Sequence, residues 1–395
     1  MIAYNKTTLD NLAVQKETTK AYKQDLISKE ERAAVDLQYP VDFYTPHFFI
    51  RVGLFTLTMI IMSFTVSFFS LFFMDNMDKA IGYIGILFAG SAYAALEYII
   101  KTKKHYRSGV DDALLYQFVG SLYASILYLA NITNMANTNT IGITGCGILF
   151  IITVFASIRF VNMIGSLIAY LSLIGTLFFI CSYIGGIVKV FVPFIIMAAS
   201  AICYAAVKIV SKRSELRYYK NCLQIIKIAT LLTFYIGGNY FVVRELSNTM
   251  FDLNLLPGQT IPFGWAFWIF TIVIPFGYLF FGIKNKDVIL IRISLLLFAA
   301  TIFTIRNYYA IAPIEIAMTI GGVVLIASCY ALTRFLREPK YGFTYKELYS
   351  DNPIDKLQVE SLLIAQSFSN QAIPPSGETK FGGGDFGGGG ATGEY

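Results

Sequence analysis

The sequence predicts an all-α, polytopic transmembrane helical bundle of about ten spans with both termini in the cytosol. Of its 395 residues, 56% are hydrophobic and only 14% are charged, whereas soluble globular proteins carry about 25% charged residues. Long apolar stretches recur from Ile50 to Leu336, and about 20 helical residues cross a hydrocarbon core of roughly 30 Å. Lys and Arg gather in every second gap between these stretches.

Residues 1–49 precede the first span and are predicted to form a cytosolic helical hairpin. They are polar, rich in Lys and Glu, and contain no apolar core of the kind found in signal peptides. The first helix is expected to start at Thr7, and Ser28 with Glu31 matches a capping box at the start of the second. Tyr39 precedes a proline and should end that helix.

Residues 50–336 are predicted to form the transmembrane domain. The expected spans are 50–73, 80–100, 112–131, 141–158, 160–181, 187–210, 221–243, 262–282, 287–305 and 311–336. The boundary between the fourth and fifth spans is marked only by Arg159 and Asn162, and the gap at 182–186 is also slight. Eight or nine spans therefore remain an alternative.

The charges of the connecting segments predict the orientation, because short cytoplasmic loops are enriched in Lys and Arg. The loop after the second span contains Lys101, Lys103, Lys104 and Arg107. Each loop on the opposite side that contains a cation has a single one, and these are Lys79, Lys189, Arg244 and Arg306. The net charge of +6 is therefore interpreted as orientation in a bacterial cytoplasmic membrane rather than as nucleic-acid binding.

The chain becomes polar after the last span. Residues 337–370 are predicted to be a cytosolic segment with a short amphipathic helix over Ile354–Ser369. Residues 371–395 are Gly-rich and are expected to be disordered. The two cytosolic ends are the candidate contact sites for a protein partner.

Motifs of enzyme chemistry are missing from the sequence. It contains no P-loop, no Rossmann glycine pattern and no Gly-x-Ser-x-Gly elbow. Its two histidines, His47 and His105, fall in different loops, and its five cysteines form no Cys-x-x-Cys pair. We therefore expect no catalytic residue, no metal site and no cofactor.

Ionisable residues inside the predicted spans are candidate functional residues, because a charge near the bilayer centre is costly. They are Glu97, Lys227, Arg292 and Glu315. None lies at the midplane, and the two cations are within snorkelling distance of the interface. Candidate ion pairs join Glu97 to Lys227 or Arg292 on the cytosolic side, and Glu315 to Arg306 on the outer side.

Uncharged polar residues form a second candidate set. Gln117 and Ser121 lie on one stripe of the third span together with Ser125, and Asn239 follows two glycines in the seventh span. Pro275 interrupts the eighth span, where it should kink the helix. A broken helix can line a binding cavity, although small and polar residues more commonly serve helix packing.

Two short segments carry a family resemblance. They are Asp25–Glu31 before the apolar spans, and Pro313-Ile314-Glu315 with Gly321-Gly322 in the last span. In these segments the chain resembles uncharacterised multi-pass bacterial membrane proteins grouped as a domain of unknown function, and its Gly-rich end is similar to tails of some Bacteroidetes-type membrane proteins. The resemblance implies an inner-membrane location but no mechanism and no functional residue.

Three hypotheses of function follow from the sequence. The first is a non-enzymatic membrane protein that acts as a scaffold or sensor through its cytosolic ends, with the lipid bilayer as its surroundings. The second is a secondary transporter of a small, weakly polar solute that uses the third and seventh spans and Pro275. The third, an intramembrane enzyme, is weakened because Glu97 and Glu315 are separated by most of the bilayer. The sequence does not fix the oligomeric state.

Overall fold

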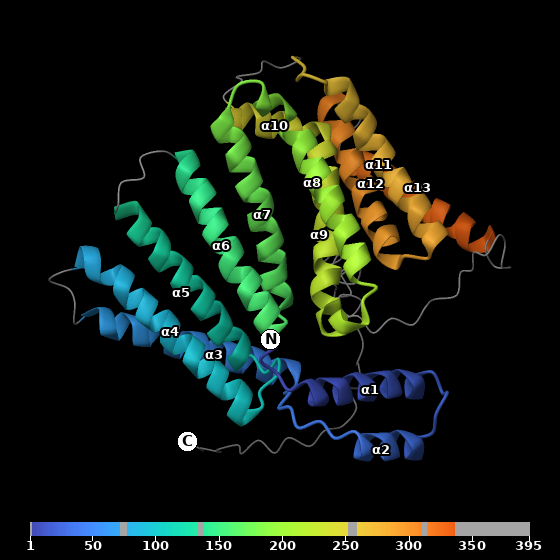
Figure 1. The fold of residues 1–395 in the computed structure, drawn as a ribbon. Coiled ribbons are helices and arrows are strands. Elements are labelled where there is room, and N and C mark those ends of the chain that lie inside the picture. The colour runs from blue at the N-terminus through green and yellow to red at the C-terminus, as the bar shows by residue number, and fades with distance from the viewer. Residues whose placement is uncertain (1, 72–76, 133–137, 252–258, 310–313, 336–395) are drawn as a thin grey trace, which may run out of the picture. The chain divides into compact units, whose positions relative to one another are not determined.

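The computed structural model describes residues 2–71, 77–132, 138–251, 259–309 and 314–335, all within one compact unit, Met1–Lys346. In these ranges the regular structure is helical (Figure 1), and a single parallel bridge joins Tyr44 to His105. The predicted all-α class is confirmed for the described residues. Both predicted segments beyond Leu336, residues 337–370 and 371–395, lie outside them.

The N-terminal segment contains two helices, α1 (Lys6–Lys23) and α2 (Lys29–Gln38). Asn5 caps α1 by accepting a hydrogen bond of 2.9 Å from the Thr7 amide, so the helix begins one residue earlier than expected. The capping box of α2 is confirmed, since the Glu31 amide donates to Ser28 Oγ and the Ser28 amide donates to the Glu31 carboxylate. At the start of each helix, polar side chains accept hydrogen bonds from backbone amides that have no partner within the helix.

The predicted spans correspond to ten long helices. They are α3 (Phe48–Leu71), α4 (Met77–Lys103), α5 (Val110–Ile132), α6 (Thr138–Phe160), α7 (Met163–Ile184), α8 (Val188–Val210), α9 (Lys220–Gly238), α11 (Gly264–Asn285), α12 (Val288–Tyr309) and α13 (Ile314–Phe335). Two shorter elements flank α9: the 3-10 helix η2 (Ser214–Tyr219) and the helix α10 (Tyr240–Phe251). Nine helices of the described chain are long and apolar enough to cross a membrane. The chain thus has the helices of a multi-pass membrane protein, while the count of ten stays a prediction.

The outer surfaces of these helices are apolar. The side chains of Phe64, Leu87 and Ile202, for example, are 72%, 75% and 69% exposed. Exposed apolar side chains of this size and number are unfavourable in water but fit the hydrocarbon core of a bilayer. The structure is therefore consistent with a lipid environment around the helices.

The two short interruptions between predicted spans, at Arg159–Asn162 and at 182–186, both separate helices in the structure. Val161 adopts a left-handed conformation with φ of 50°, and the Asn162 side chain accepts a 2.7 Å hydrogen bond from the Gly165 amide at the start of α7. Gly185 and Gly186 have φ of 70° and 56° and form the turn from α7 to α8. Glycine tolerates this region at no steric cost, so a turn of few residues reverses the chain.

The prediction that the seventh span continues to residue 243 is wrong. α9 ends at Gly238, and Asn239 takes an extended conformation before α10 begins. Two consecutive glycines weaken the helix at this point, and the Asn239 side chain then accepts a hydrogen bond of 3.1 Å from the Val242 amide, as an N-cap does. The apolar run continues through the break, which is why hydropathy alone did not reveal it.

α9 contacts α7, α8, α10, α11 and α12, whereas α5 contacts α3, α4 and α6. Close approach between α4 and α5 depends on small residues, since a side chain at Gly85 would collide with Ser125 of α5.

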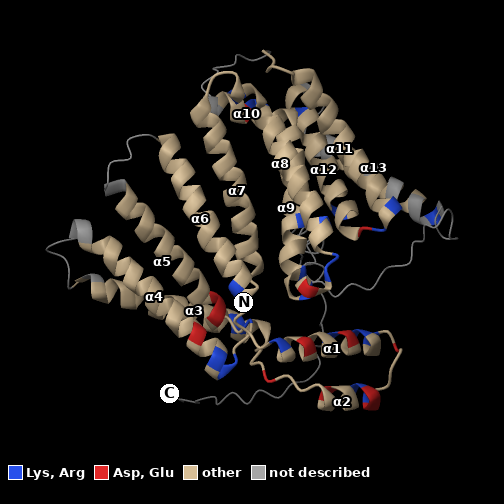
Figure 2. Ribbon diagram, viewed as in Figure 1, with Lys and Arg blue, Asp and Glu red and all other residues tan. Residues whose placement is uncertain are grey.

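Figure 2 shows acidic and basic residues gathered where α4, α6, α8 and α11 end and where α5, α7 and α9 begin. This end of the helices carries most of the described chain's ionic chemistry, and we call it the charged end.

Candidate functional site

The start of the chain is held at the charged end by an anchor network, which we define as Tyr4, Asp10, Asp111, Arg159 and Tyr218. Tyr4 is buried, with 8% of its surface exposed, and its hydroxyl lies 3.4 Å from Asp111 Oδ2 in α5. The Tyr218 hydroxyl donates a 2.8 Å hydrogen bond to Asp10 in α1. The Ala3 amide donates to the Arg159 carbonyl at 2.8 Å. Residues from α5, α6 and η2 therefore all bind the N-terminal segment.

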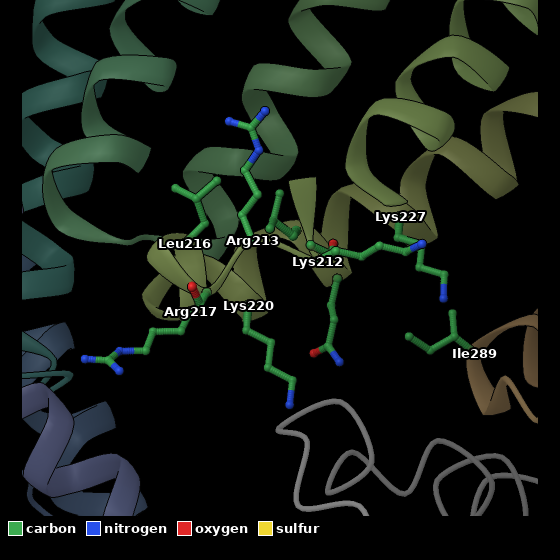
Figure 3. Close-up of a pocket in the computed structure, with 11 residues that line it drawn as sticks. Lys212, Arg213, Leu216, Arg217, Lys220, Lys227 and Ile289 are labelled. Carbon is green, nitrogen blue, oxygen red and sulfur yellow. The ribbon is translucent and has the colours of Figure 1, made fainter. Parts of the chain in front are cut away.

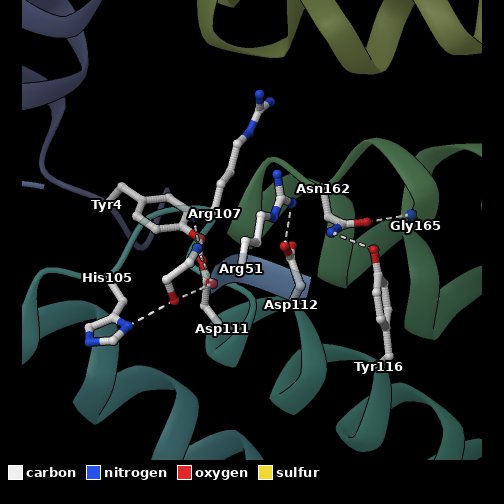
Figure 4. A network of polar contacts seen from close by, with 10 residues as sticks. Tyr4, Arg51, His105, Arg107, Asp111, Asp112, Tyr116, Asn162 and Gly165 are labelled. Carbon is white, nitrogen blue, oxygen red and sulfur yellow. Dashed lines mark hydrogen bonds and ion pairs between the residues drawn. The ribbon is translucent and has the colours of Figure 1, made fainter. Parts of the chain in front are cut away.

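Asp111 organises the loop on which Tyr4 rests (Figure 4). Its carboxylate accepts hydrogen bonds from the Arg107 amide at 2.7 Å, the Ser108 amide at 2.8 Å and the Ser108 hydroxyl at 3.0 Å. These bonds compensate the burial of Asp111, which is only 3% exposed. The carboxylate also lies in the first turn of α5, where the helix dipole stabilises a negative charge.

Burial raises the pKa of the Tyr4 hydroxyl well above its ordinary value, and the negative charges of Asp111 and Asp112 raise it further. The phenol therefore keeps its proton and can donate it to the Asp111 carboxylate. Its ring makes edge-to-face contacts with Tyr106, at 5.0 Å between centroids, and with Phe43, at 6.2 Å. Such pairs add to the apolar burial that holds the N-terminus.

A second set of contacts joins the helix starts beside the anchor network. Arg51 of α3 forms an ion pair of 2.5 Å with Asp112 of α5. Figure 4 shows this pair next to Asn162, whose amide lies 3.4 Å from the Tyr116 hydroxyl. Gly109, with φ of 95°, brings the loop before α5 against the backbone of Arg51. The starts of α3, α5 and α7 are thus linked through polar side chains.

The predicted partners of Glu97 are wrong. Its carboxylate forms ion pairs with Arg159 of α6 at 2.6 Å and with Lys101, one turn along α4, at 2.7 Å. The Tyr93 hydroxyl donates a further bond of 3.0 Å. Several cations lie at the same depth as Glu97, and the sequence could not indicate which helix neighbours α4. In the sequence Arg159 marks the boundary between two spans and is the cation of the short loop there, and neither feature indicates a contact with Glu97.

Lys227 instead forms an ion pair with Asp287, the residue that precedes α12. Asp287 also accepts a 3.2 Å hydrogen bond from the Ile289 amide, so it caps α12. The sequence reasoning missed Asp287 because it fell at the edge of a span, although an Asp before an apolar run is a helix-start signal. Arg292, the other proposed partner of Glu97, is exposed on α12.

The serine hydroxyls of the polar stripe in the third span, which is α5, donate hydrogen bonds to backbone carbonyls of the same helix. Ser121 donates to the Gln117 carbonyl at 2.5 Å, and Ser125 donates to the Ser121 carbonyl at 2.7 Å. Ser125 is 6% exposed and packs beside Gly85 of α4. The stripe therefore serves helix packing along α5 and is not brought together with Asn239 of the α9–α10 junction.

Asn239 lies in a buried polar cluster with residues of α9 and α12. Its amide donates to the Tyr235 hydroxyl at 2.9 Å and to Thr304 Oγ1 at 3.1 Å. Tyr235 and Thr301 Oγ1 are 3.0 Å apart, and Thr301 also donates to the carbonyl of Thr271 in α11 at 3.0 Å. Each buried group has a partner, as expected of a polar cluster that stabilises helix contacts in a membrane.

Other predicted features lie partly outside the described residues. Glu315 belongs to α13, but its side chain and its expected pair with Arg306 are not described. Pro275 is buried within α11, which runs through it. In the described part of the chain, no group of three or more His, Cys, Asp or Glu side chains could hold a metal ion. Four cysteines there are free: Cys146, Cys181, Cys203 and Cys222.

His105 predicts a pH dependence of stability. Its Nδ1 lies 2.8 Å from the Ser108 hydroxyl, and burial lowers its pKa below the ordinary value, although the charge of Asp111 raises it. The unfolded chain therefore binds the proton at a higher pH than the folded protein does. We expect full stability above about pH 6.5 and a decline as the pH falls below it.

The measurement is the apparent melting temperature of wild type and of His105→Gln in detergent, from pH 7.5 to 5. The difference between the two proteins isolates the contribution of His105 to the pH dependence of stability. Wild type should lose stability over this range faster than the variant does. Parallel curves for the two proteins would contradict the prediction.

Comparison with models of known protein families, with curated proteins and with solved structures finds no match to this chain. The resemblance to uncharacterised multi-pass bacterial proteins therefore stays a prediction, with which the nine described helices long and apolar enough to cross a membrane are consistent.

Proposed function

We propose that this protein is a non-enzymatic scaffold or sensor of a bacterial cytoplasmic membrane. In this proposal the chain crosses the bilayer ten times with both termini in the cytosol, and α1 and α2 present a surface to a protein partner. The observation that carries the proposal is the anchor network, because it ties the N-terminal segment to α5, α6 and η2 through Asp111, Arg159 and Tyr218.

The orientation is supported by the concentration of cations at the charged end, since cytoplasmic loops are enriched in Lys and Arg. A partner surface is supported by the side chains of the hairpin. Leu26 and Leu37 are 71% and 84% exposed, and no residue of α2 is buried. A partner that covers these two leucines would remove apolar surface from water, which favours binding. A partner bound there would act on α5 and α6 through the anchor network.

The test is quantitative co-purification of the full chain from mild detergent after chemical cross-linking in cells. We expect Leu26→Glu with Leu37→Glu to lower the yield of one specific cross-linked partner at least tenfold, with an unchanged melting temperature. The control, Lys23→Gln with Lys29→Gln, changes the net charge of the same hairpin by the same amount and should retain the partner. If neither the leucine variant nor deletion of residues 347–395 changes any partner, the scaffold proposal is wrong.

Tyr4 offers a separate prediction about the anchor network. Tyr4→Ala should remove the buried ring and the bond to Asp111, at a cost of about 3 kcal/mol or more, and should release the N-terminal segment. Limited proteolysis of the intact protein should then cleave within α1 at least tenfold faster than in wild type. Tyr4→Phe keeps the ring contacts and should change the rate only slightly. Equal rates for wild type and Tyr4→Ala would show that the network does not hold the segment.

A transporter remains the second candidate, because α9 breaks at Asn239 beside the proline-containing α11. Discontinuous helices line the substrate sites of many secondary transporters. Asn239→Ala and Lys227→Ala should then abolish solute uptake by proteoliposomes, compared at equal amounts of monodisperse protein. Uptake that is the same in wild type and in both variants would remove this candidate.

A further inference from the structure

A cavity of about 450 Å³ lies at the charged end, where α8 is followed by η2 and α9. Five of its eleven lining residues are Lys or Arg and none is Asp or Glu. We call it the basic cavity and define it by Lys212, Lys220 and Lys227, with Leu216, Leu223 and Ile289 as its apolar part. It is distinct from the anchor network, which shares none of these six residues.

Among the described residues, acidic side chains compensate only part of the charge of the basic cavity. Arg217 forms an ion pair of 2.7 Å with Asp10, and Lys227 forms one with Asp287. Figure 3 shows Lys220 and Lys227 extending to the same side of the site and Lys212 beside Lys227, while Arg213 extends away from them. Lysines gathered around one space create a positive potential that attracts an anion.

The pair between Lys227 and Asp287 lies between this cavity and a second one. The neighbouring cavity, of about 320 Å³, shares Ser211 and Lys227 with the basic cavity and is also lined by Asp287. Asp287 therefore neutralises Lys227 from the neighbouring cavity. Lys212 and Lys220, which are exposed, supply the positive charge on the other side.

The position of the basic cavity suits the headgroup level of a membrane. α8 ends at Val210 and α9 begins at Lys220, so the cavity lies where the apolar helices end. Ile202 and Ile209 of α8 are 69% and 64% exposed and give the outer face of this helix an apolar surface, while other residues of the α8 end line the cavity. Basic pockets between membrane helices bind the phosphate of anionic lipids, and lysine is a common phosphate ligand.

We propose that the basic cavity binds a phosphate group, with Lys212 and Lys220 as its principal ligands and Lys227 as a third. The group belongs either to the headgroup of an anionic lipid or to a free phosphate compound. Both have the same negatively charged oxygens, and they differ in that only a lipid has acyl chains.

The test measures binding to the full-length protein in neutral detergent. The probes are phosphatidylglycerol, phosphatidylcholine, glycerol 1-phosphate and inorganic phosphate, each titrated at constant ionic strength. Lys212→Gln with Lys220→Gln should weaken binding of the anionic probe at least tenfold, since each lysine near such a group contributes about 1 kcal/mol, or about fivefold. Both side chains are exposed, so the melting temperature without probe should not change.

Two control variants make the comparison specific. Lys23→Gln with Lys29→Gln removes the same charge from the N-terminal hairpin and should alter binding less than twofold. Lys212→Arg with Lys220→Arg keeps the charge and should retain most of the binding. Binding should also weaken as the salt concentration rises.

The results separate the two sources of phosphate. Binding of phosphatidylglycerol without binding of the two soluble probes or of phosphatidylcholine would assign the site to a lipid headgroup. Binding of the soluble probes with the same dependence on Lys212 and Lys220 would assign it to a free phosphate compound. Equal losses in both Lys→Gln variants, or no binding of any anionic probe by wild type, would overturn the proposal. Neither result depends on the hairpin's partner, so the scaffold proposal is tested separately.

Discussion

Gly109→Ala should destabilise the protein by about 3 kcal/mol or more, because two unfavourable effects act at this residue. Its φ of 95° is a conformation that only glycine adopts easily, and strain of this kind costs roughly 1–3 kcal/mol. A Cβ at this position would also collide with the backbone of Arg51 in α3, and overpacking costs roughly 1–3 kcal/mol more. The start of α3 would have to move away from α5, which would disturb the Arg51–Asp112 ion pair.

Gly120→Ala is the matched control for this prediction. Gly120 lies within α5, and no heavy atom is within 4 Å of the place where its Cβ would be. Alanine there should stabilise the helix by roughly 0.5–1 kcal/mol. Apparent melting temperatures of both variants in detergent, with the fraction of monodisperse protein by gel filtration, measure the difference. If the two substitutions shift the melting temperature equally, the close contact between the α5 loop and α3 is wrong.

Glu97→Ala should also have a large effect, a loss of about 2–3 kcal/mol of stability. The Glu97 side chain is 13% exposed and Arg159 is 24% exposed, so the substitution leaves a largely buried guanidinium without its main partner. Because the Arg159 carbonyl accepts the Ala3 amide, the end of α6 should loosen its hold on the N-terminus. Faster proteolysis within α1 should therefore accompany the lower melting temperature.

Asp36→Ala provides the comparison for Glu97→Ala. Asp36 pairs with Arg32 at 3.8 Å, and both side chains are more than a third exposed. Exposed pairs of this kind contribute about 0–1 kcal/mol, so the variant should melt within a degree or two of wild type. A Glu97→Ala protein as stable as Asp36→Ala would mean that the Glu97–Arg159 pair is fully hydrated and does not link α4 to α6.

The features that could be predicted from the sequence are those that depend on neighbouring residues along the chain. The capping box of Ser28 and Glu31, the short turn at Gly185 and Gly186 and the apolar lengths of the spans all have local causes. The break at Asn239 also has a local cause, two glycines before an Asn, but the apolar run on both sides concealed it. Hydropathy reports how apolar a stretch of residues is. It therefore does not reveal a helix end that falls inside an apolar stretch.

The candidate site could be predicted only in part. Glu97 and Lys227 do carry buried or half-buried ion pairs, yet their partners are Arg159 and Asp287 rather than each other. The depth of a charge follows from the sequence, because each residue adds about 1.5 Å along a helix. The identity of the facing helix does not, since several helices offer a cation at the same depth.

By itself the sequence determined that this protein is helical, that its helices are long and apolar enough for a membrane, and that its cations gather in alternate connections. These properties follow from local hydrophobicity, helix capping and charge. Only the tertiary structure decided that Tyr4 is buried against Asp111, that Arg159 joins Glu97 and that Lys212, Lys220 and Lys227 surround one cavity. Such contacts join residues far apart in the chain, and they depend on which helices pack together. Helix packing in turn depends on small residues and on the shapes of the helix surfaces, which hydropathy does not describe.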